Sequence, residues 1–305
     1  MRMKRYIFKL FTGRRKFIFI VCFALCTVII HHHWFFIHDS LARVSGAIKK
    51  GDNVRADTLY DDGLDERILL SNKVTKNPSI ILLAGQSNME GYGEVSMLEN
   101  HILSTENQII NASPIINNKR FGPEIGMLNY LEAKGIKDNI IVKFAVGATS
   151  QYAWSPYYNI DLADSTGNKN SGALFDDFRD VIKQVRQFYD TDVKALFWAQ
   201  GERDAFYPHA ADEYYENCKI LFEEIRLLTG KKELPIYIAL INPPDRYKGK
   251  ITVINAQLRL AKEDENIYII DTKALPKLAD DLHYSTNGVL ELGRRFGESL
   301  YPDRN

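Results

Sequence analysis

Residues 80–93 read Ile-Ile-Leu-Leu-Ala-Gly-Gln-Ser-Asn-Met-Glu-Gly-Tyr-Gly, and this stretch decides the fold. Its apolar run ends abruptly at Gly85-Gln86-Ser87-Asn88, which is typical of a buried parallel strand that turns sharply into a loop or a helix. Ser87 would then lie at the carboxyl end of a strand, where open α/β sheets bind their ligands. Taken alone, Ser87 is explained equally well as a helix N-cap, so the rest of the chain has to decide.

The remainder of the chain alternates short apolar runs with amphipathic segments, which predicts an α/β fold with a parallel sheet covered on both faces. We expect five strands, at Ser79–Leu83, Asn139–Ala145, Ala195–Ala199, Ile236–Ile241 and Ile267–Asp271. We expect the main helices at Glu124–Lys134, Leu174–Tyr189, Ala210–Leu228, Lys250–Glu263 and Thr286–Leu300. In the second helix, apolar residues from Phe175 to Phe188 recur at three- and four-residue spacing, and we assign them to the core.

Composition excludes several classes of protein. The 305 residues are 45% hydrophobic, which suits a well-packed globular protein. Residues 1–16 carry seven Lys or Arg and no acids, so the remainder has 32 basic and 39 acidic residues, a net charge of −7 that argues against nucleic-acid binding. Two of the three cysteines lie in the apolar N-terminal run, which leaves one thiol and no internal disulfide in the body. No Cys/His cluster or HExxH motif indicates a metal site, and we expect neither metal nor cofactor.

The N-terminus has the pattern of a membrane anchor. The 14 apolar residues Phe17–Ile30 would span about 21 Å as a helix, and extension through Ile37 reaches the ~30 Å of a hydrocarbon core. We therefore expect a cytoplasmic tail at 1–16, an uncleaved single-pass transmembrane signal-anchor at 17–37, a stem at 38–78 and an extracytoplasmic, periplasmic or lumenal, domain at 79–305. A cleavable signal peptide and a buried core helix are the alternatives, although no small-x-small cleavage site follows Ile30.

Polar and aromatic residues follow the predicted strands. Val146–Ser150 and the aromatic residues around Trp154 follow the second strand, Gln200–Asp204 follow the third, and Asp280-Asp281-Leu282-His283 precede the final helix. Each residue has a plainer explanation: a surface histidine, a helix cap, solvated loop charges, or an aromatic side chain that packs a loop rather than stacking on a sugar. Their coincidence at one rim nevertheless supplies a hydroxyl, an imidazole with a carboxylate, and donors for an oxyanion, as acyl transfer requires.

Five motifs in order resemble a known group of enzymes, the SGNH hydrolases of the sialate O-acetylesterase and acetylxylan esterase type. The resemblance covers about Ser79 to Tyr301 and implies a flavodoxin-like three-layer α/β/α fold and a serine esterase that removes acetyl groups from carbohydrate hydroxyls. The motifs are Gly85-Gln86-Ser87-Asn88-Met89-x-Gly91, Gly122-Pro123-Glu124-x-Gly126, Gly147-x-Thr149-Ser150, Trp198-x-Gln200-Gly201-Glu202-x-Asp204 and Asp280-x-x-His283.

The same match implies roles for individual residues. Ser87 would be the nucleophile, His283 the general base and Asp280 its partner, with oxyanion donors from the Ser87 and Gly147 backbones and the Gln200 side chain. Gln86, Glu202 and Trp154 are candidate substrate-binding residues, although Glu202 also suits a role in supporting the loops.

Two features of the sequence weaken the match to the family pattern. Ala148 replaces a usual second glycine, which would strain the oxyanion loop if that position needs a positive φ. Asp281 adjoins Asp280 and is an alternative partner for the histidine.

The leading hypothesis is a membrane-anchored esterase that deacetylates O-acetylated carbohydrates, such as sialic acid or xylan, through an acetyl-enzyme. A carbohydrate O-acetyltransferase on the same fold shares that intermediate and is the first alternative. A glycan-binding protein that has lost catalysis is the second, suggested by Ala148 and the aromatic loop. No sequence pattern specifies the oligomeric state.

Overall fold

The computed structural model describes residues 78–98, 107–114, 117–169 and 171–302. The predicted tail at 1–16, the anchor at 17–37 and nearly all of the stem at 38–78 lie outside these residues. Across the described ranges, no helix has both the length and the hydrophobicity that a membrane crossing requires.

The described residues form one six-stranded, wholly parallel sheet with the strand order β3-β5-β1-β6-β7-β8. The five expected strands are all present, with ends within two residues of the expected ones. In chain order the sheet reads 2-3-1-4-5-6, which differs from the 2-1-3-4-5 order of flavodoxin. The strands are β1 (Ser79–Gly85), β3 (Asn107–Asn111), β5 (Asn139–Ala145), β6 (Val193–Ala199), β7 (Ile236–Ala239) and β8 (Ile267–Ile270).

The expectation of five strands was wrong because β3 does not look like a buried strand in sequence. Its residues are Asn-Gln-Ile-Ile-Asn, yet all five are buried. Tertiary hydrogen bonds compensate for that burial: Asn107 Oδ1 accepts from the backbone and side chain of Asn139 at 3.0 and 2.9 Å, and Gln108 Oε1 accepts from the Tyr189 hydroxyl at 2.8 Å. These partners are distant in the chain, so local hydropathy does not reveal them.

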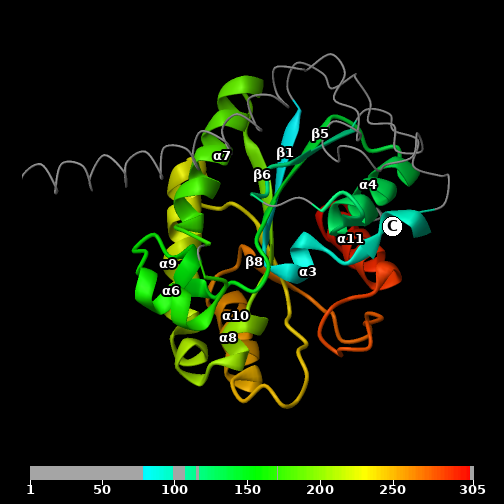
Figure 1. The fold of residues 1–305 in the computed structure, drawn as a ribbon. Helices are drawn as coiled ribbons and strands as arrows, with labels where there is room; N and C mark the ends of the chain where they lie inside the picture. The colour runs from blue at the N-terminus through cyan, green and yellow to red at the C-terminus, as the bar shows by residue number, and fades with distance from the viewer. Residues whose placement is uncertain (1–77, 99–106, 115–116, 170, 303–305) are drawn as a thin grey trace, which may run out of the picture. The chain divides into compact units, whose positions relative to one another are not determined.

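Helices cover both faces of the sheet and make three layers (Figure 1). Ile80 and Leu82 of β1 point into a core shared with α7, α9 and α10, while Ile81 and Leu83 point into a second core shared with α4 and α11. The helices are α3 (Ser87–Glu90), α4 (Pro123–Ala133), α5 (Gln151–Trp154), α6 (Ile160–Thr166), α7 (Leu174–Tyr189), α8 (Glu202–Phe206), α9 (Pro208–Thr229), α10 (Lys250–Glu263) and α11 (Thr286–Leu300), with the 3-10 turn η2 (Val95–Met97). The short strands β2 (Gly93–Glu94) and β4 (Arg120–Phe121) pair antiparallel outside the main sheet.

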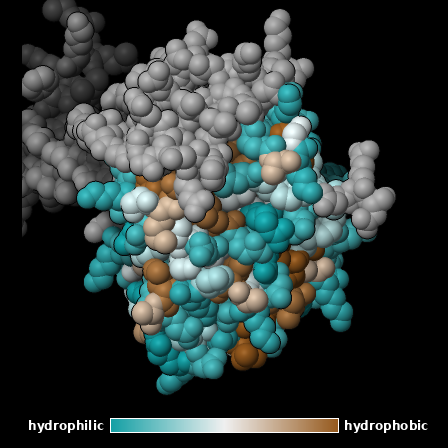
Figure 2. All heavy atoms as spheres, turned by 90° about the vertical axis from the view of Figure 1, so that its right-hand side faces the viewer, coloured by the Kyte–Doolittle hydropathy of each residue, from teal (hydrophilic) through white to brown (hydrophobic). Residues whose placement is uncertain are grey.

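Helices α4 and α11 pack closely because glycines lie where they meet. A Cβ atom on Gly126 would lie 2.1 Å from the Leu290 carbonyl oxygen, and one on Gly293 would lie 2.0 Å from that of Pro123. This contact holds α11, and with it the end of the loop that precedes it, against α4. On the described part of the face in Figure 2, hydrophilic residues separate small hydrophobic patches, as is usual for a solvated helical layer.

One residue of the predicted α7 stripe lies outside the core. Phe178 is fully buried, whereas Phe188 is 48% exposed. At about 100° per residue, Phe188 lies roughly 80° around the helix from Phe178, at the edge of the apolar stripe. Spacing alone therefore extended the stripe by one residue too many.

The two phenylalanines provide a matched test of this core. We expect Phe178→Ala to lower the free energy of unfolding by about 3–5 kcal/mol because it leaves a cavity in a close-packed layer. Phe188→Ala should lower it by about 1 kcal/mol or less, since that ring is half in solvent. Urea denaturation followed by circular dichroism measures both, and equal losses in the two variants would contradict this packing.

Candidate active site

The structure brings the three predicted triad residues together at the carboxyl edge of the sheet. Ser87 is the first residue of α3, directly after β1, while Asp280 and His283 lie in the loop between β8 and α11. Nε2 of His283 is 3.1 Å from Ser87 Oγ, and Nδ1 is 2.6 Å from Asp280 Oδ2. A proton held on Nδ1 by the carboxylate leaves Nε2 free to accept from the serine hydroxyl.

Asp280, and not Asp281, is the carboxylate that orients the histidine. Its Oδ1 accepts from the backbone N–H groups of Leu282 and His283 at 2.9 and 3.0 Å. Burial raises the pKa of Asp280, but these donors and the imidazole outweigh it, and the pKa lies below its usual value. Asp281 instead pairs with Lys277 Nζ at 3.1 Å and has a left-handed backbone with φ 57°.

A buried carboxylate holds the residues on both sides of Ser87. Glu202 accepts from Gln86 Nε2 at 2.6 Å and from Asn88 Nδ2 at 2.7 Å. Burial raises the pKa of Glu202, while the two amide donors and His283 lower it, and the rise is the larger effect. Gln86 and Glu202 are thus buried and bonded to each other, so the structure places them as supports of Ser87 and not on a substrate surface.

Asn88 also reaches the loop that carries the histidine. Its Nδ2 contacts the Leu282 carbonyl oxygen at 3.4 Å, and its Oδ1 accepts from the Tyr284 backbone N–H at 3.2 Å. Asn88, which follows Ser87 in the chain, is therefore bonded to both neighbours of His283. The sequence motif contains Asn88 but does not indicate this role.

A stack of side chains backs the imidazole. The Tyr92 ring stacks on the His283 ring with centroids 4.1 Å apart and an interplanar angle of 26°, and the Arg120 guanidinium carbon lies 4.2 Å from the Tyr92 centroid. The three groups restrict rotation of the imidazole from outside the triad. Neither Tyr92 nor Arg120 carries a sequence signal for this role, because the stack joins a loop after α3 to β4 only in the folded chain.

The two backbone groups predicted as oxyanion donors, those of Ser87 and Gly147, lie close together in the structure. The Ser87 N–H opens α3 and so has no acceptor within that helix. Gly147 lies beside it, since a Cβ on Gly147 would be 3.6 Å from Ser87 Cβ. Ala148 has φ 58°, so the sequence departure noted above does place a non-glycine residue in the left-handed region, at a cost of about 1–3 kcal/mol.

The predicted third donor, the Gln200 side chain, is engaged elsewhere. Its Nε2 donates to the Thr149 carbonyl oxygen at 3.0 Å and to Asp204 Oδ2, and the residue is fully buried. If the amide were turned over, its carbonyl oxygen would face the acceptor oxygens of Thr149 and Asp204, so these two contacts require the nitrogen at this position. In this structure Gln200 therefore supports the oxyanion loop through Thr149 and presents no free N–H to Ser87. Burial raises the pKa of its partner Asp204 to about 7.

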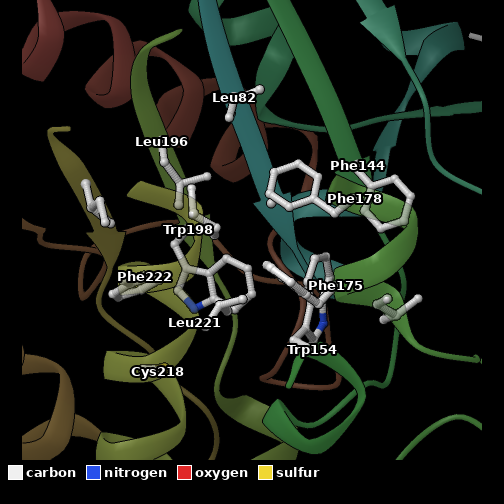
Figure 3. Packing of buried hydrophobic residues seen from close by; sticks show 14 of the residues in the cluster. Leu82, Phe144, Trp154, Phe175, Phe178, Leu196, Trp198, Cys218, Leu221 and Phe222 are labelled. Carbon is white, nitrogen blue, oxygen red and sulfur yellow. The ribbon is translucent and has the colours of Figure 1, made fainter. Parts of the chain in front are cut away.

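Trp154 also differs from its expected role. It is 0% exposed, its Nε1 donates to Thr149 Oγ1 at 3.1 Å, and its ring packs edge-on against Trp198 with centroids 5.0 Å apart. Figure 3 shows it within the core beside Phe144 and Phe178. The aromatic loop folds inwards as α5, so packing, the plainer alternative, is what the structure shows for Trp154.

A buried ion pair supports α3 from below. Lys143 Nζ lies 2.6 Å from Glu124 Oε1, and both side chains are almost wholly buried. The same ammonium group donates to the Glu90 carbonyl oxygen at 3.2 Å, at the end of α3. A lysine within the apolar run Ile-Ile-Val-Lys-Phe-Ala is a signal that could have identified this pair, because a charge in a buried strand requires a partner.

Comparison with known proteins gives one family and a set of related structures. The family model described as carbohydrate esterase, sialic acid-specific acetylesterase, matches residues 77–301. A probable carbohydrate esterase of Arabidopsis thaliana is 31% identical over 102 residues, which is 33% of this chain and only 38% of that relative's length.

The X-ray structure of that Arabidopsis protein aligns with a TM-score of 0.57 at 22% identity, over 73% of this chain and 98% of the other. A carbohydrate acetylesterase from Xanthomonas citri aligns with a TM-score of 0.53 at 17% identity, over 74% and 57% of the two chains. At these identities the two likenesses support the fold alone.

The two neighbouring aspartates provide a matched test of the triad. We expect Asp280→Asn to slow the reaction of Ser87 with a fluorophosphonate reagent by about 10³-fold or more, because the imidazole loses the carboxylate that fixes its tautomer. Asp281→Asn should leave the rate within about threefold, since asparagine tolerates the left-handed backbone and Asp281 does not contact His283. A comparable loss in Asp281→Asn would contradict the assignment. Mass spectrometry of the labelled serine measures both rates.

Proposed function

The chain belongs to the carbohydrate esterase family of sialic acid-specific acetylesterases, and from that premise we propose that it is a serine esterase that removes O-acetyl groups from carbohydrates. The observation that carries this proposal is the hydrogen-bonded series Ser87–His283–Asp280, with distances of 3.1 and 2.6 Å. A nucleophile, a base and an orienting carboxylate in that geometry are the requirements of acyl transfer through a covalent intermediate.

In the first half-reaction Ser87 Oγ attacks the acetyl carbonyl carbon while its proton passes to His283 Nε2. Asp280 stabilises the imidazolium that forms. Negative charge develops on the carbonyl oxygen, which the backbone N–H groups of Ser87 and Gly147 are placed to receive. The bond to the sugar oxygen then breaks, and the sugar leaves with the proton from His283.

In the second half-reaction water replaces the sugar. His283 takes a proton from the water, whose oxygen attacks the acetyl-enzyme, and the proton then returns to Ser87 Oγ as acetate leaves. If a sugar hydroxyl took the place of this water, the same site would transfer acetate instead of hydrolysing it. The family favours hydrolysis, and we propose hydrolysis as the reaction.

The substrate that the family description favours is an O-acetylated sialic acid, and an acetylated polysaccharide such as xylan is the second class. Support for the wider class comes from the Arabidopsis and Xanthomonas relatives, which are described as a probable carbohydrate esterase and a carbohydrate acetylesterase. Any contact with the sugar has to come from exposed residues at the rim, because Trp154, Gln86 and Glu202 are buried.

A substrate panel with a nucleophile variant tests this proposal. We expect the purified domain to release acetate from p-nitrophenyl acetate and from at least one O-acetylated sialic acid or xylan fragment. Ser87→Ala should lose about 10³-fold or more of that activity, since Ser87 Oγ is the hydroxyl bonded to His283 Nε2 among the described residues. Undiminished release by Ser87→Ala would overturn the nucleophile, and acetylated acceptor in place of free acetate would indicate transfer.

We also propose that residues 17–37 anchor the enzyme in a membrane with the domain from 79 onwards on the extracytoplasmic side. The support is the basic prefix at 1–16 followed by an apolar run of spanning length. We expect the full chain to stay with membranes after a carbonate wash, and a chain starting at Asp39 to be released. Release of the full chain, or a processed N-terminus found by sequencing, would contradict an uncleaved anchor.

A further inference from the structure

A carboxylate that the triad does not use lies in the oxyanion region. Glu90 is on the same short helix as Ser87, three residues later. A Cβ atom placed on Gly147 would lie 2.6 Å from Glu90 Oε2 and 3.6 Å from Ser87 Cβ. The Glu90 carboxylate therefore lies close to Gly147, the residue beside Ser87 whose N–H is a predicted oxyanion donor.

The Gly147 N–H is within hydrogen-bonding reach of this carboxylate. Burial raises the pKa of Glu90 above its usual value, while Lys143, the Gly147 N–H, Arg120 and His283 lower it, and burial is the larger effect. These groups come from β5, the loop after it, β4 and the loop before α11, and Lys143 is itself paired with Glu124 of α4. Glu90 thus has the cationic side chains of Lys143 and Arg120 near it, and its carboxylate lies against Gly147, whose N–H is a predicted oxyanion donor.

An ionised carboxylate at this position opposes the reaction in two ways. It competes with the substrate carbonyl for the Gly147 N–H, and its charge repels the negative charge that develops on the tetrahedral intermediate. The Gln200 side chain does not offer a substitute donor, because both of its N–H groups are engaged.

We propose that Glu90 occupies the oxyanion position of the free enzyme and competes with the ester carbonyl, so that it sets how readily the site accepts its substrate. This inference rests on the proposed esterase function. Substrate has to displace the carboxylate from the Gly147 N–H or meet it in its neutral, protonated form. Glu90 acts through the oxyanion donor and not on the reacting atoms, so it is a positioning residue.

The ratio of two pH profiles tests the proposal. We expect Glu90→Gln to raise kcat/KM for p-nitrophenyl acetate by about tenfold at neutral pH, because a neutral amide forms a weaker bond to the Gly147 N–H than a carboxylate does. The pKa of Glu90 is raised from 4.5, and the inhibitory form is the ionised one. The ratio of variant to wild type should therefore approach one at the acidic end and rise to a plateau as Glu90 ionises.

Two controls separate this role from others. Glu94→Gln removes the same charge from an exposed position four residues later and should leave kcat/KM within about twofold of wild type at every pH. In the ¹⁵N-labelled wild-type protein, the Gly147 amide resonance should shift with pH as Glu90 titrates. This shift depends on no variant and no activity, and it should be absent in Glu90→Gln.

The outcomes are distinct. A fall in kcat/KM for Glu90→Gln, or a ratio that does not change with pH, would overturn the competition. A Gly147 amide that does not respond to the titration of Glu90 would overturn the contact itself. Failure of the proposed function would look different, because wild type would then show no Ser87-dependent release of acetate at all.

Discussion

The geometry of the site depends on one buried carboxylate, that of Glu202. Its two oxygens hold Gln86 and Asn88, the residues on each side of Ser87, and Asn88 in turn holds both neighbours of His283. The nucleophile and the base are 196 residues apart in the chain, yet their 3.1 Å contact follows from this short series of hydrogen bonds. Burying a charge is costly unless donors surround it, and two amide donors at 2.6 and 2.7 Å meet that requirement.

Beneath the site, other buried charged groups are likewise held by an ion pair or by hydrogen bonds. Lys143 and Glu124 form an ion pair under α3, and Asp204 holds the Gln200 amide against the loop that contains Ala148. That loop has a non-glycine residue with φ 58°, so its conformation is held by its surroundings and not by its own preference. Strain in the oxyanion loop is tolerable because Thr149, next to it, is bonded on both sides, by Gln200 at its carbonyl oxygen and by Trp154 at its hydroxyl.

The sequence predicted the parts of this molecule whose determinants are local. Apolar runs located five strands to within two residues at each end, and the helix at Leu174–Tyr189 agrees with the structure to the residue. It did not reveal β3, where buried asparagine and glutamine are compensated by residues far along the chain. It also could not separate Trp154 as a packing residue from Trp154 as a sugar platform, because an aromatic side chain suits both until the direction of the loop is known. Gln200 shows the same limit, since a motif places an amide near the site but does not say which acceptors it already has.

Trp154 and Gln200 are buried and bonded to other parts of the protein, so neither takes the role that the sequence predicted for it at the substrate. Gln86, Asn88 and Glu202, which hold Ser87 and the loop of His283 in place, are buried and bonded to one another, so we expect substitutions among them to act on the reaction for every substrate. Exposed side chains lie outside that network: Tyr157 is 74% exposed after α5, and Arg120 is exposed above Tyr92. Since exposed side chains change at little cost to stability, the acetylated sugar can vary while the acyl chemistry stays the same. On the proposed function, a single buried scaffold is therefore compatible with different acetylated sugars, and we expect the exposed rim to select between them.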